Sequence, residues 1–367
     1  MRRRGIDAES LWLVAATTAA VLAVQTLTKS KPERPHANGA RRKPSADIAD
    51  AAQPGRGRES TTPLEIPRAG WKDILWRTYQ QINDDRLLAI AAGVVFYGLL
   101  AVFPAITALV SCYGMFADAS TIADNLQTLA MVLPAGSFQI VQDQIARVLA
   151  KGPASLGFTF LFGIALALWS ANAGVKAVID ALNVVYDERE KRSFIKLNAL
   201  ALSFTIGGIM ALLVMVSAVV AFPLAMDSIG LAQDSKLLVS WARWPLLLIV
   251  VIAVLGLLYR FGPSRPGARW EWLGTGTIVA ATLWLAGSLL LSWYLASFGN
   301  YDATYGSLGA AIGLMMWMWM SAIIVLCGAE LNAEIEHQTA TDTTVGPGRP
   351  MGARGASMAD TLGRAIT

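Results

Sequence analysis

Charged residues are scarce in this sequence. Of its 367 residues, only 15% are Asp, Glu, Lys or Arg, whereas 54% are hydrophobic and the mean hydropathy is +0.48. Soluble domains usually carry about a quarter charged residues. The charges gather in the first 90 residues, in short loops and in the tail, and long apolar blocks separate them. This distribution excludes an ordinary soluble domain and predicts an all-α, polytopic membrane helix bundle.

The side chains that most often serve catalysis or metal binding are also few. The two histidines are His36 and His337, and the two cysteines are Cys112 and Cys327. No His, Cys and carboxylate cluster has the spacing of a metal site, and no Gly-rich loop precedes Lys-Ser or Lys-Thr. We expect no cofactor, no metal site and no enzymatic activity. Because the cysteines fall near opposite membrane faces, we also expect no disulfide.

The net charge of +4 has two interpretations. A basic protein can bind nucleic acid. Membrane proteins also become basic because Lys and Arg gather in their cytoplasmic loops. The second interpretation fits the apolar composition, so we expect membrane lipids as partners and no nucleic acid.

Six apolar segments between residues 71 and 337 have roughly the length that crosses a bilayer. They run over residues 87–115, 155–175, 197–221, 244–258, 272–298 and 307–329. The first contains Pro104, which should kink it. The fourth is short unless it starts near Leu237. We therefore predict a six-span membrane domain over residues 71–337.

Four other segments fall outside these spans. Residues 1–28 include the apolar stretch Leu11–Leu27, an accessory anchor that is marginally long enough to span. Residues 29–70 are basic and poor in apolar residues, which predicts a disordered linker, and the tail 338–367 is expected to be disordered too. Residues 118–153 have the periodicity of two amphipathic helices.

Loop charge predicts the orientation. Eleven Lys and Arg residues fall on the side that holds both ends of the six-span domain, against four on the other side. The ends of the domain should therefore be cytoplasmic, in a bacterial inner membrane, and the amphipathic pair should face outward.

Four segments carry a family resemblance. They read LAIAAGVVFYGLLAVFPAI (88–106), LWSANAGVKAVIDALNVVYDEREKRSFIK (168–196), LYRFGPSRPGARWEW (258–272) and SFGNYDATYGSLGAAIG…LCGAELNAEIE (297–336). In order and spacing they resemble the YihY/virulence factor BrkB family, formerly labelled ribonuclease BN-like. The resemblance covers about residues 71–337 and implies a six-span bacterial inner-membrane protein. For activity it implies only proposals of envelope lipid handling or transport.

The last span ends in acids, although a helix C-terminus already carries partial negative charge. Cations should therefore face them, and loop charge brings Arg260 and the end of the second span to the same membrane face. We predict a cytoplasmic cluster of charged and amide side chains. Its members are Asn172, Lys176, Asp180, Arg260, Glu330, Asn332 and Glu334. The cluster is either a structural latch or a gate that contacts a substrate.

The favoured function is the handling or transport of a lipid or other amphiphile without ATP. An alternative is a structural envelope protein that binds an unidentified protein partner. A ribonuclease is the least favoured reading, because the basic loops are short and no acid–base site is evident.

Overall fold

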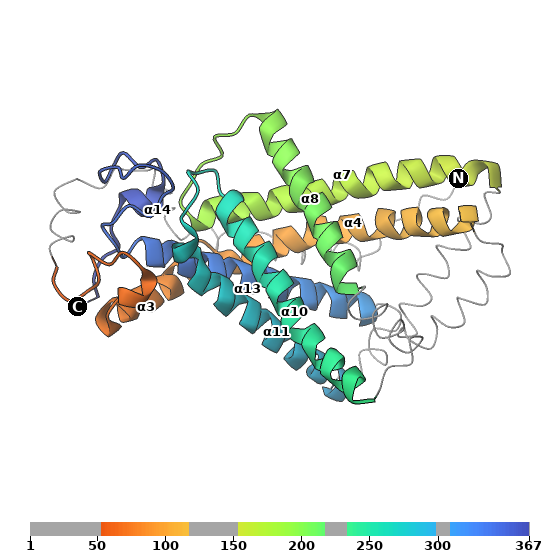
Figure 1. The fold of residues 1–367 in the computed structure, drawn as a ribbon. Helices are drawn as coiled ribbons and strands as arrows, with labels where there is room; N and C mark the ends of the chain where they lie inside the picture. Colours follow the sequence, from red (N-terminus) through yellow and green to blue (C-terminus); the bar gives the residue numbers. More distant parts are fainter. Residues whose placement is uncertain (1–52, 117–152, 217–232, 299–308, 367) are drawn as a thin grey trace, which may run out of the picture. The chain divides into compact units, whose positions relative to one another are not determined.

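A computed structural model describes residues 53–116, 153–216, 233–298 and 309–366 (Figure 1). In these ranges the regular elements are helices, joined by turns and loops, and no strand occurs in them beyond one isolated antiparallel bridge between Ala268 and Thr344. The elements are the short 3-10 helix η1 (Pro63–Glu65), α3 (Arg68–Asp84), α4 (Leu87–Phe116), α7 (Pro153–Val185), α8 (Phe194–Val216), α10 (Gln233–Phe261), α11 (Trp270–Phe298), α13 (Gly309–Glu336) and α14 (Ser357–Asp360).

Four of the described helices contain a stretch long and apolar enough to cross a membrane. These stretches are Leu161–Val185, Phe194–Ala211, Trp270–Tyr294 and Ala311–Glu336, and shorter apolar stretches occupy Leu87–Ala101 and Leu247–Phe261. The prediction of an all-α protein with several membrane helices is therefore confirmed. The amphipathic pair at 118–153 and the anchor at 1–28 lie outside the described residues.

Tight packing is concentrated where α4 and α11 begin and where α7, α10 and α13 end. The fully buried side chains here include Leu87, Tyr186, Tyr259, Leu273 and Ala329. We call this region the packed end. Farther along the same helices, large apolar side chains are exposed, as at Trp169 and Leu290. Exposure of this kind is what lipid-facing helices present.

Two helix pairs form the frame of the packed end. α4 lies beside α7, and α11 lies against α13 (Figure 1). The second contact is very close, because a Cβ added to Gly276 would overlap the carbonyl oxygen of Gly328. Small residues permit such backbone contact between membrane helices.

Prolines and left-handed residues set the turns at the packed end. Pro263 and Pro266 follow α10 directly, and proline cannot continue a helix. Arg86 (φ 53°) reverses the chain between α3 and α4, and Asp187 (φ 49°) ends the run of α7. These turns bring α3 and two interhelical loops to the same place.

Helix α3 buries a face that is partly charged. Its buried face holds Ile74, but also Asp73 and Arg77, whereas Leu75 and Tyr79 are exposed. The charged pair is buried because each member finds an ion partner: Asp73 pairs with Arg56 at 2.7 Å, and Arg77 pairs with Glu334. Helix α3 thus packs on α13.

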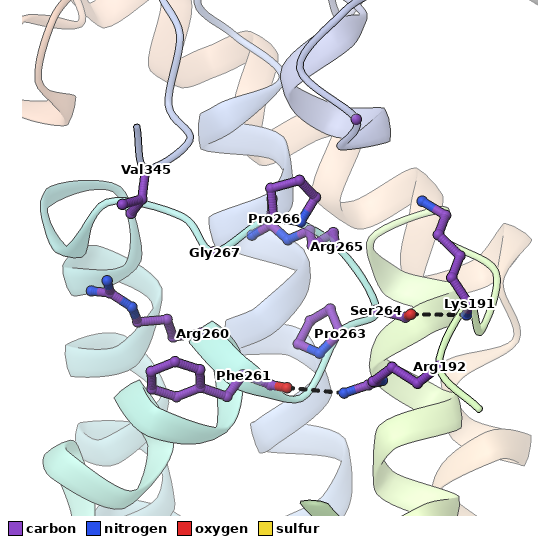
Figure 2. A pocket seen from close by; sticks show the side chains of 11 residues that line it. Lys191, Arg192, Arg260, Phe261, Pro263, Ser264, Arg265, Pro266, Gly267 and Val345 are labelled. Atoms are coloured by element: carbon purple, nitrogen blue, oxygen red, sulfur yellow. Dashed lines mark hydrogen bonds between the residues drawn. The ribbon is translucent and has the colours of Figure 1, made fainter. Parts of the chain in front are cut away.

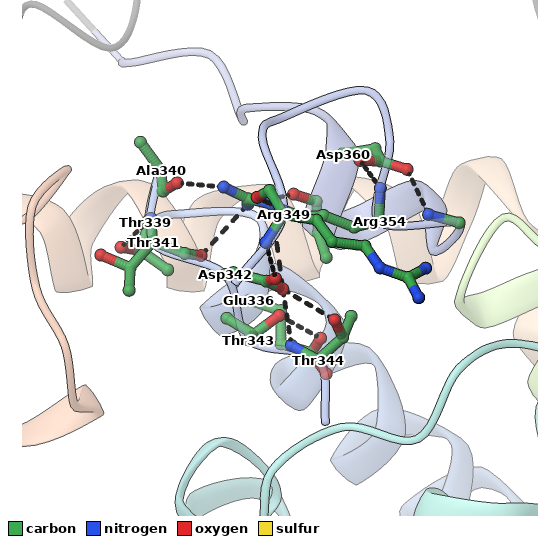
Figure 3. A network of polar contacts seen from close by, with 12 residues as sticks. Glu336, Thr339, Ala340, Thr341, Asp342, Thr343, Thr344, Arg349, Arg354 and Asp360 are labelled. Atoms are coloured by element: carbon green, nitrogen blue, oxygen red, sulfur yellow. Dashed lines mark hydrogen bonds and ion pairs between the residues drawn. The ribbon is translucent and has the colours of Figure 1, made fainter. Parts of the chain in front are cut away.

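The segments expected to be disordered differ from that expectation where the structure describes them. Residues 53–67 and 338–366, which we call the terminal cap, fold together over the end of α13. Arg58 donates to the carbonyls of Gln338 (3.1 Å) and Gly363 (2.7 Å). Arg354 donates to four more, those of Ala340, Thr341, Arg349 and Ala359. Figure 3 shows Asp342 binding Arg349 and Thr344 within the same network.

Candidate functional site

The acids of α13 are buried rather than reaching water. The exposed fractions of Glu330, Glu334 and Glu336 are 0%, 2% and 0%. α13 runs to Glu336, two turns past the predicted end at Ala329, so the acids sit within the helix. A buried charge needs a partner, because desolvation is costly.

Two of the three acids have arginine partners from other segments. The Arg77 guanidinium of α3 pairs with Glu334 and also donates to its backbone carbonyl. The Arg265 guanidinium, in the loop after α10, forms two bonds of 2.7 and 2.8 Å to Glu336. Glu330 has no hydrogen-bond partner among the described residues. The cations predicted to face these acids, Arg260 and Lys176, have other neighbours.

The polar face of α7 points to α8. Asn172 and Lys176 both donate to the side-chain oxygen of Asn198, each at 3.1 Å. Asp180, the third predicted residue of this face, is exposed. The sequence analysis missed Asn198, whose only signal is an amide at the start of an apolar segment.

Asn332 joins α13 to α11. Its side-chain oxygen accepts a hydrogen bond from the backbone amide of Gly276 at 2.8 Å. Gly276 is the seventh residue of α11, past the four N–H groups that a helix start leaves free, so this bond is an additional one between the two helices. Asn332 therefore supports the close contact between these helices and does not belong to a charge cluster.

Arg260 stacks on aromatic rings instead of pairing with an acid. Its guanidinium carbon lies 4.4 Å from the ring centre of Trp270 and 5.5 Å from that of Phe261. Its Nε and Nη1 atoms are buried without a hydrogen-bond partner in the described part of the chain. The predicted cluster is therefore divided. Asn172 and Lys176 bind α8, Asn332 binds α11, and Arg260 stacks on aromatic rings.

The side chain of Arg260 contributes to a cavity of about 740 Å³ at the packed end. The loop from α7 to α8, the loop from α10 to α11 and the terminal cap supply its walls. Figure 2 shows Arg260 and Phe261 on one side, Lys191 and Arg192 on the other, and Pro263, Ser264 and Arg265 between them. Val345 and Gly355 of the terminal cap also line it. We call this cavity the basic pocket.

Most cations of the basic pocket already have acidic partners. Lys191 pairs with Glu188 (2.7 Å), and Arg192 pairs with Glu190 (2.8 Å). Burial alone would raise the pKa of Glu190, but hydrogen bonds from Arg192 and Asn183 lower it to about 2. Glu190 is therefore ionised at neutral pH and pairs with Arg192. Arg265 pairs with Glu336, so Arg260 is the pocket cation without a carboxylate partner among the described residues.

Comparison with known proteins identifies the family. The sequence model of virulence factor BrkB matches residues 78–350. This chain belongs to the virulence factor BrkB family. A ribonuclease-like protein, YfkH, of Bacillus subtilis (strain 168) is 32% identical over 251 residues, which cover 66% of this chain and 88% of YfkH.

Two further relatives of this BrkB-family chain are named as membrane proteins. A UPF0761 membrane protein of Idiomarina loihiensis is 24% identical over 72% of this chain and 96% of its own length. One from Vibrio atlanticus is 26% identical over 75% of this chain and 87% of its own length. No solved structure matches the chain.

The BrkB-family match extends past the last membrane helix. It ends at residue 350, so it includes the part of the terminal cap that contains Asp342 and Val345. Sequence analysis had placed the end of the resemblance at about residue 337. Arg77, Arg265 and Asn183, which hold the packed end together, were also missed as a group, because only their tertiary partners distinguish them from other loop residues.

Proposed function

We propose that this BrkB-family protein binds the anionic head group of a membrane amphiphile in the basic pocket, as one step in handling or transporting that amphiphile. The single observation that carries the proposal is the state of Arg260. It lines the pocket, stacks on Trp270 and Phe261, and lacks an acidic partner among the described residues. An arginine guanidinium binds phosphate through two parallel hydrogen bonds, which suits a lipid head group.

The size of the pocket supports this ligand class. Ligand cavities commonly enclose about 300–1,000 Å³, and the basic pocket falls within that range. Its walls combine the cations with apolar Phe261, Pro263 and Pro266. A lipid phosphate with the first part of its glycerol backbone has this mixture of charge and apolar surface.

The proposal includes a six-span arrangement in a bacterial inner membrane. α4 and α10 would supply the two spans beyond the four long apolar stretches, since they have 30 and 29 residues. The packed end, which holds most of the loop cations, would face the cytoplasm, where positive loops gather. The basic pocket would then lie at the level of the inner-leaflet head groups, which attract clustered Lys and Arg.

The alternative is a structural or partner-binding envelope protein. It draws support from the complete pairing of Arg77, Arg265 and Arg192, which is typical of a latch. The ribonuclease alternative has less support, because no group of three or more His, Cys, Asp and Glu residues in the described ranges could hold a metal ion. Its only support is the name of the Bacillus relative.

The test is lipid retention by the full-length protein, measured by native mass spectrometry. Wild type, Arg260→Ala and Arg269→Ala would each be reconstituted with phosphatidylglycerol or phosphatidylcholine. Arg269 is the control, because it lies in the loop that follows α10, is exposed, donates to the carbonyl of Thr344 and does not line the basic pocket. Competition with glycerol phosphate and inorganic phosphate separates a lipid site from a free-phosphate site.

We expect wild type and Arg269→Ala to retain phosphatidylglycerol over phosphatidylcholine, and Arg260→Ala to lose that preference by about tenfold, which corresponds to one charge-assisted pair. Equal retention by all three proteins would refute lipid binding here and favour the structural alternative. Displacement by inorganic phosphate alone would assign the pocket to a soluble anion.

A further inference from the structure

Glu330 is the buried acid of α13 that has no counter-charge. Its exposed fraction is 0%, and both carboxylate oxygens lack a hydrogen-bond partner in the described residues. Glu334 and Glu336, one and nearly two turns away, each have an arginine. A buried carboxylate without partners is far less stable than the neutral acid.

The neighbours of Glu330 are acids and a phenol. The groups that act on it electrostatically are Glu334 and Cys327 of its own helix, Asp85 between α3 and α4, and Tyr186 after α7. The nearby cations are committed elsewhere: Arg77 to Glu334, Arg265 to Glu336, and His337 lies 3.5 Å from Glu334. None of these cations compensates a charge on Glu330.

A second polar group at this place also lacks a partner. The Tyr186 side chain is fully buried, and its hydroxyl forms no hydrogen bond with the described residues. Arg265 stacks over the Tyr186 ring at 4.1 Å, so the ring is held in position without using the hydroxyl. Tyr186 and Glu330 therefore form a buried polar site separate from the basic pocket.

We propose that Glu330 is a buried proton-binding site, and that its proton occupancy is coupled to the charge on Asp85. Asp85 is partly buried at the turn between α3 and α4. Protonation forms one O–H bond on the Glu330 carboxylate, and the proton comes from a hydronium ion of the solvent, whose O–H bond breaks. One proton moves, and no oxidant or reductant takes part. The site extends beyond the proposed anion binding and does not depend on it.

The titration of Asp85 fits this role. Burial, followed by the charges of Asp187, Asp84 and Glu334, raises the pKa of Asp85 to about 7. An acid with a pKa near ambient pH both accepts and releases protons readily. Glu334 and Asp85 both act electrostatically on Glu330, and acids that interact titrate as a set rather than singly.

Infrared spectroscopy tests the site directly. Spectra of the full-length protein in lipid nanodiscs at pH 7 would be recorded for wild type, Glu330→Gln and Asp85→Asn. The control is Glu271→Gln, which removes an exposed acid of α11 outside this buried site. The observable is the C=O stretching band of protonated carboxylic acids, together with its loss on raising the pH.

We expect the band in wild type and in Glu271→Gln, a weaker band in Asp85→Asn, and loss of the Glu330 contribution in Glu330→Gln. Absence of the band in wild type, or an unchanged band in Glu330→Gln, would overturn the proposal. If Glu330→Gln did not fold, Glu330→Asp would decide: a shifted band supports the site, and an unshifted band assigns the proton elsewhere.

Discussion

The side-chain oxygen of Asn183, near the end of α7, accepts a hydrogen bond from the backbone amide of Ser264 at 2.7 Å. The side-chain nitrogen of Asn183 donates to Glu190 at 3.2 Å. Ser264 in turn accepts a hydrogen bond from the Lys191 amide. One buried amide therefore connects both loops that form the basic pocket, and the pocket's shape depends on it.

Replacing Asn183 with Ala should loosen both loops. The buried Ser264 amide would lose its acceptor, which typically costs about 1–3 kcal/mol of unfolding free energy. Thermal unfolding of the detergent-solubilised protein would measure the loss. Asn83→Ala is the matched control, because that exposed amide donates only to the carbonyl of Tyr79 in its own helix. Equal stability of the two variants would contradict the proposed role of Asn183.

The ion pair of Arg77 and Glu334 should be strongly coupled. Arg77→Ala leaves a buried carboxylate without its main counter-charge, and breaking a buried pair costs about 3–5 kcal/mol. The double variant Arg77→Ala with Glu334→Gln should recover part of that loss, because it removes the stranded charge. A double-mutant cycle of unfolding free energies would show the coupling, and additive losses would mean that the pair contributes nothing specific.

Asp85 should make stability depend on pH. Its pKa is raised to about 7 in the folded protein, against an ordinary value near 4 in the unfolded chain. Its neutral form is therefore favoured in the folded state, so stability is full below about pH 4 and falls as the pH rises toward 7. The unfolding temperature of wild type should drop between pH 5 and pH 8 more than that of Asp85→Asn. Glu271→Gln, which removes an exposed acid that does not act on Asp85, should behave like wild type.

Adding even a methyl group between α11 and α13 should lower the stability of the protein. Gly276→Ala would place its Cβ against Gly328 and the side chain of Asn332, so the helices would have to separate. We expect a loss of about 1–3 kcal/mol, as for other overpacked sites. Gly207→Ala in α8 is the control, because a Cβ there meets nothing within 4 Å. A Gly276→Ala protein as stable as Gly207→Ala would show that the contact is not tight.

Local sequence signals predicted the helices well, and the partners of polar residues poorly. The range expected for one span, 272–298, is close to Trp270–Phe298 of α11, because the length of an apolar run is written in the sequence. The sequence does not show that Arg77 and Arg265, rather than Arg260, pair with the α13 acids. Arg77 lies within α3, Arg260 in the last turn of α10 and Arg265 in the loop after it, and only the packing of α3 and of the α10–α11 loop decides which of them reach the acids.

The terminal cap was missed for a different reason. Its composition is polar, and disorder is expected when a segment has little apolar surface to bury. Its order comes from guanidinium groups that satisfy several backbone carbonyls at once, as Arg354 does. Such bonds depend on which carbonyls the folded chain brings to the guanidinium, so no periodicity in the sequence indicates them.

The helices are held firmly at the packed end and have fewer contacts along their far halves, so their stiffness should decrease along their length. Ion pairs, an inter-helix amide bond and buried aromatic rings clamp α7, α10, α11 and α13 at one end. The far halves of α7 and α11 carry exposed Phe162 and Trp293 instead. A helix that is fixed at one end moves most at the other, so the displacement of its backbone atoms should grow with their distance from the packed end. Backbone amides should exchange with solvent deuterium most slowly near Tyr259 and Ala329, and progressively faster along each helix away from them.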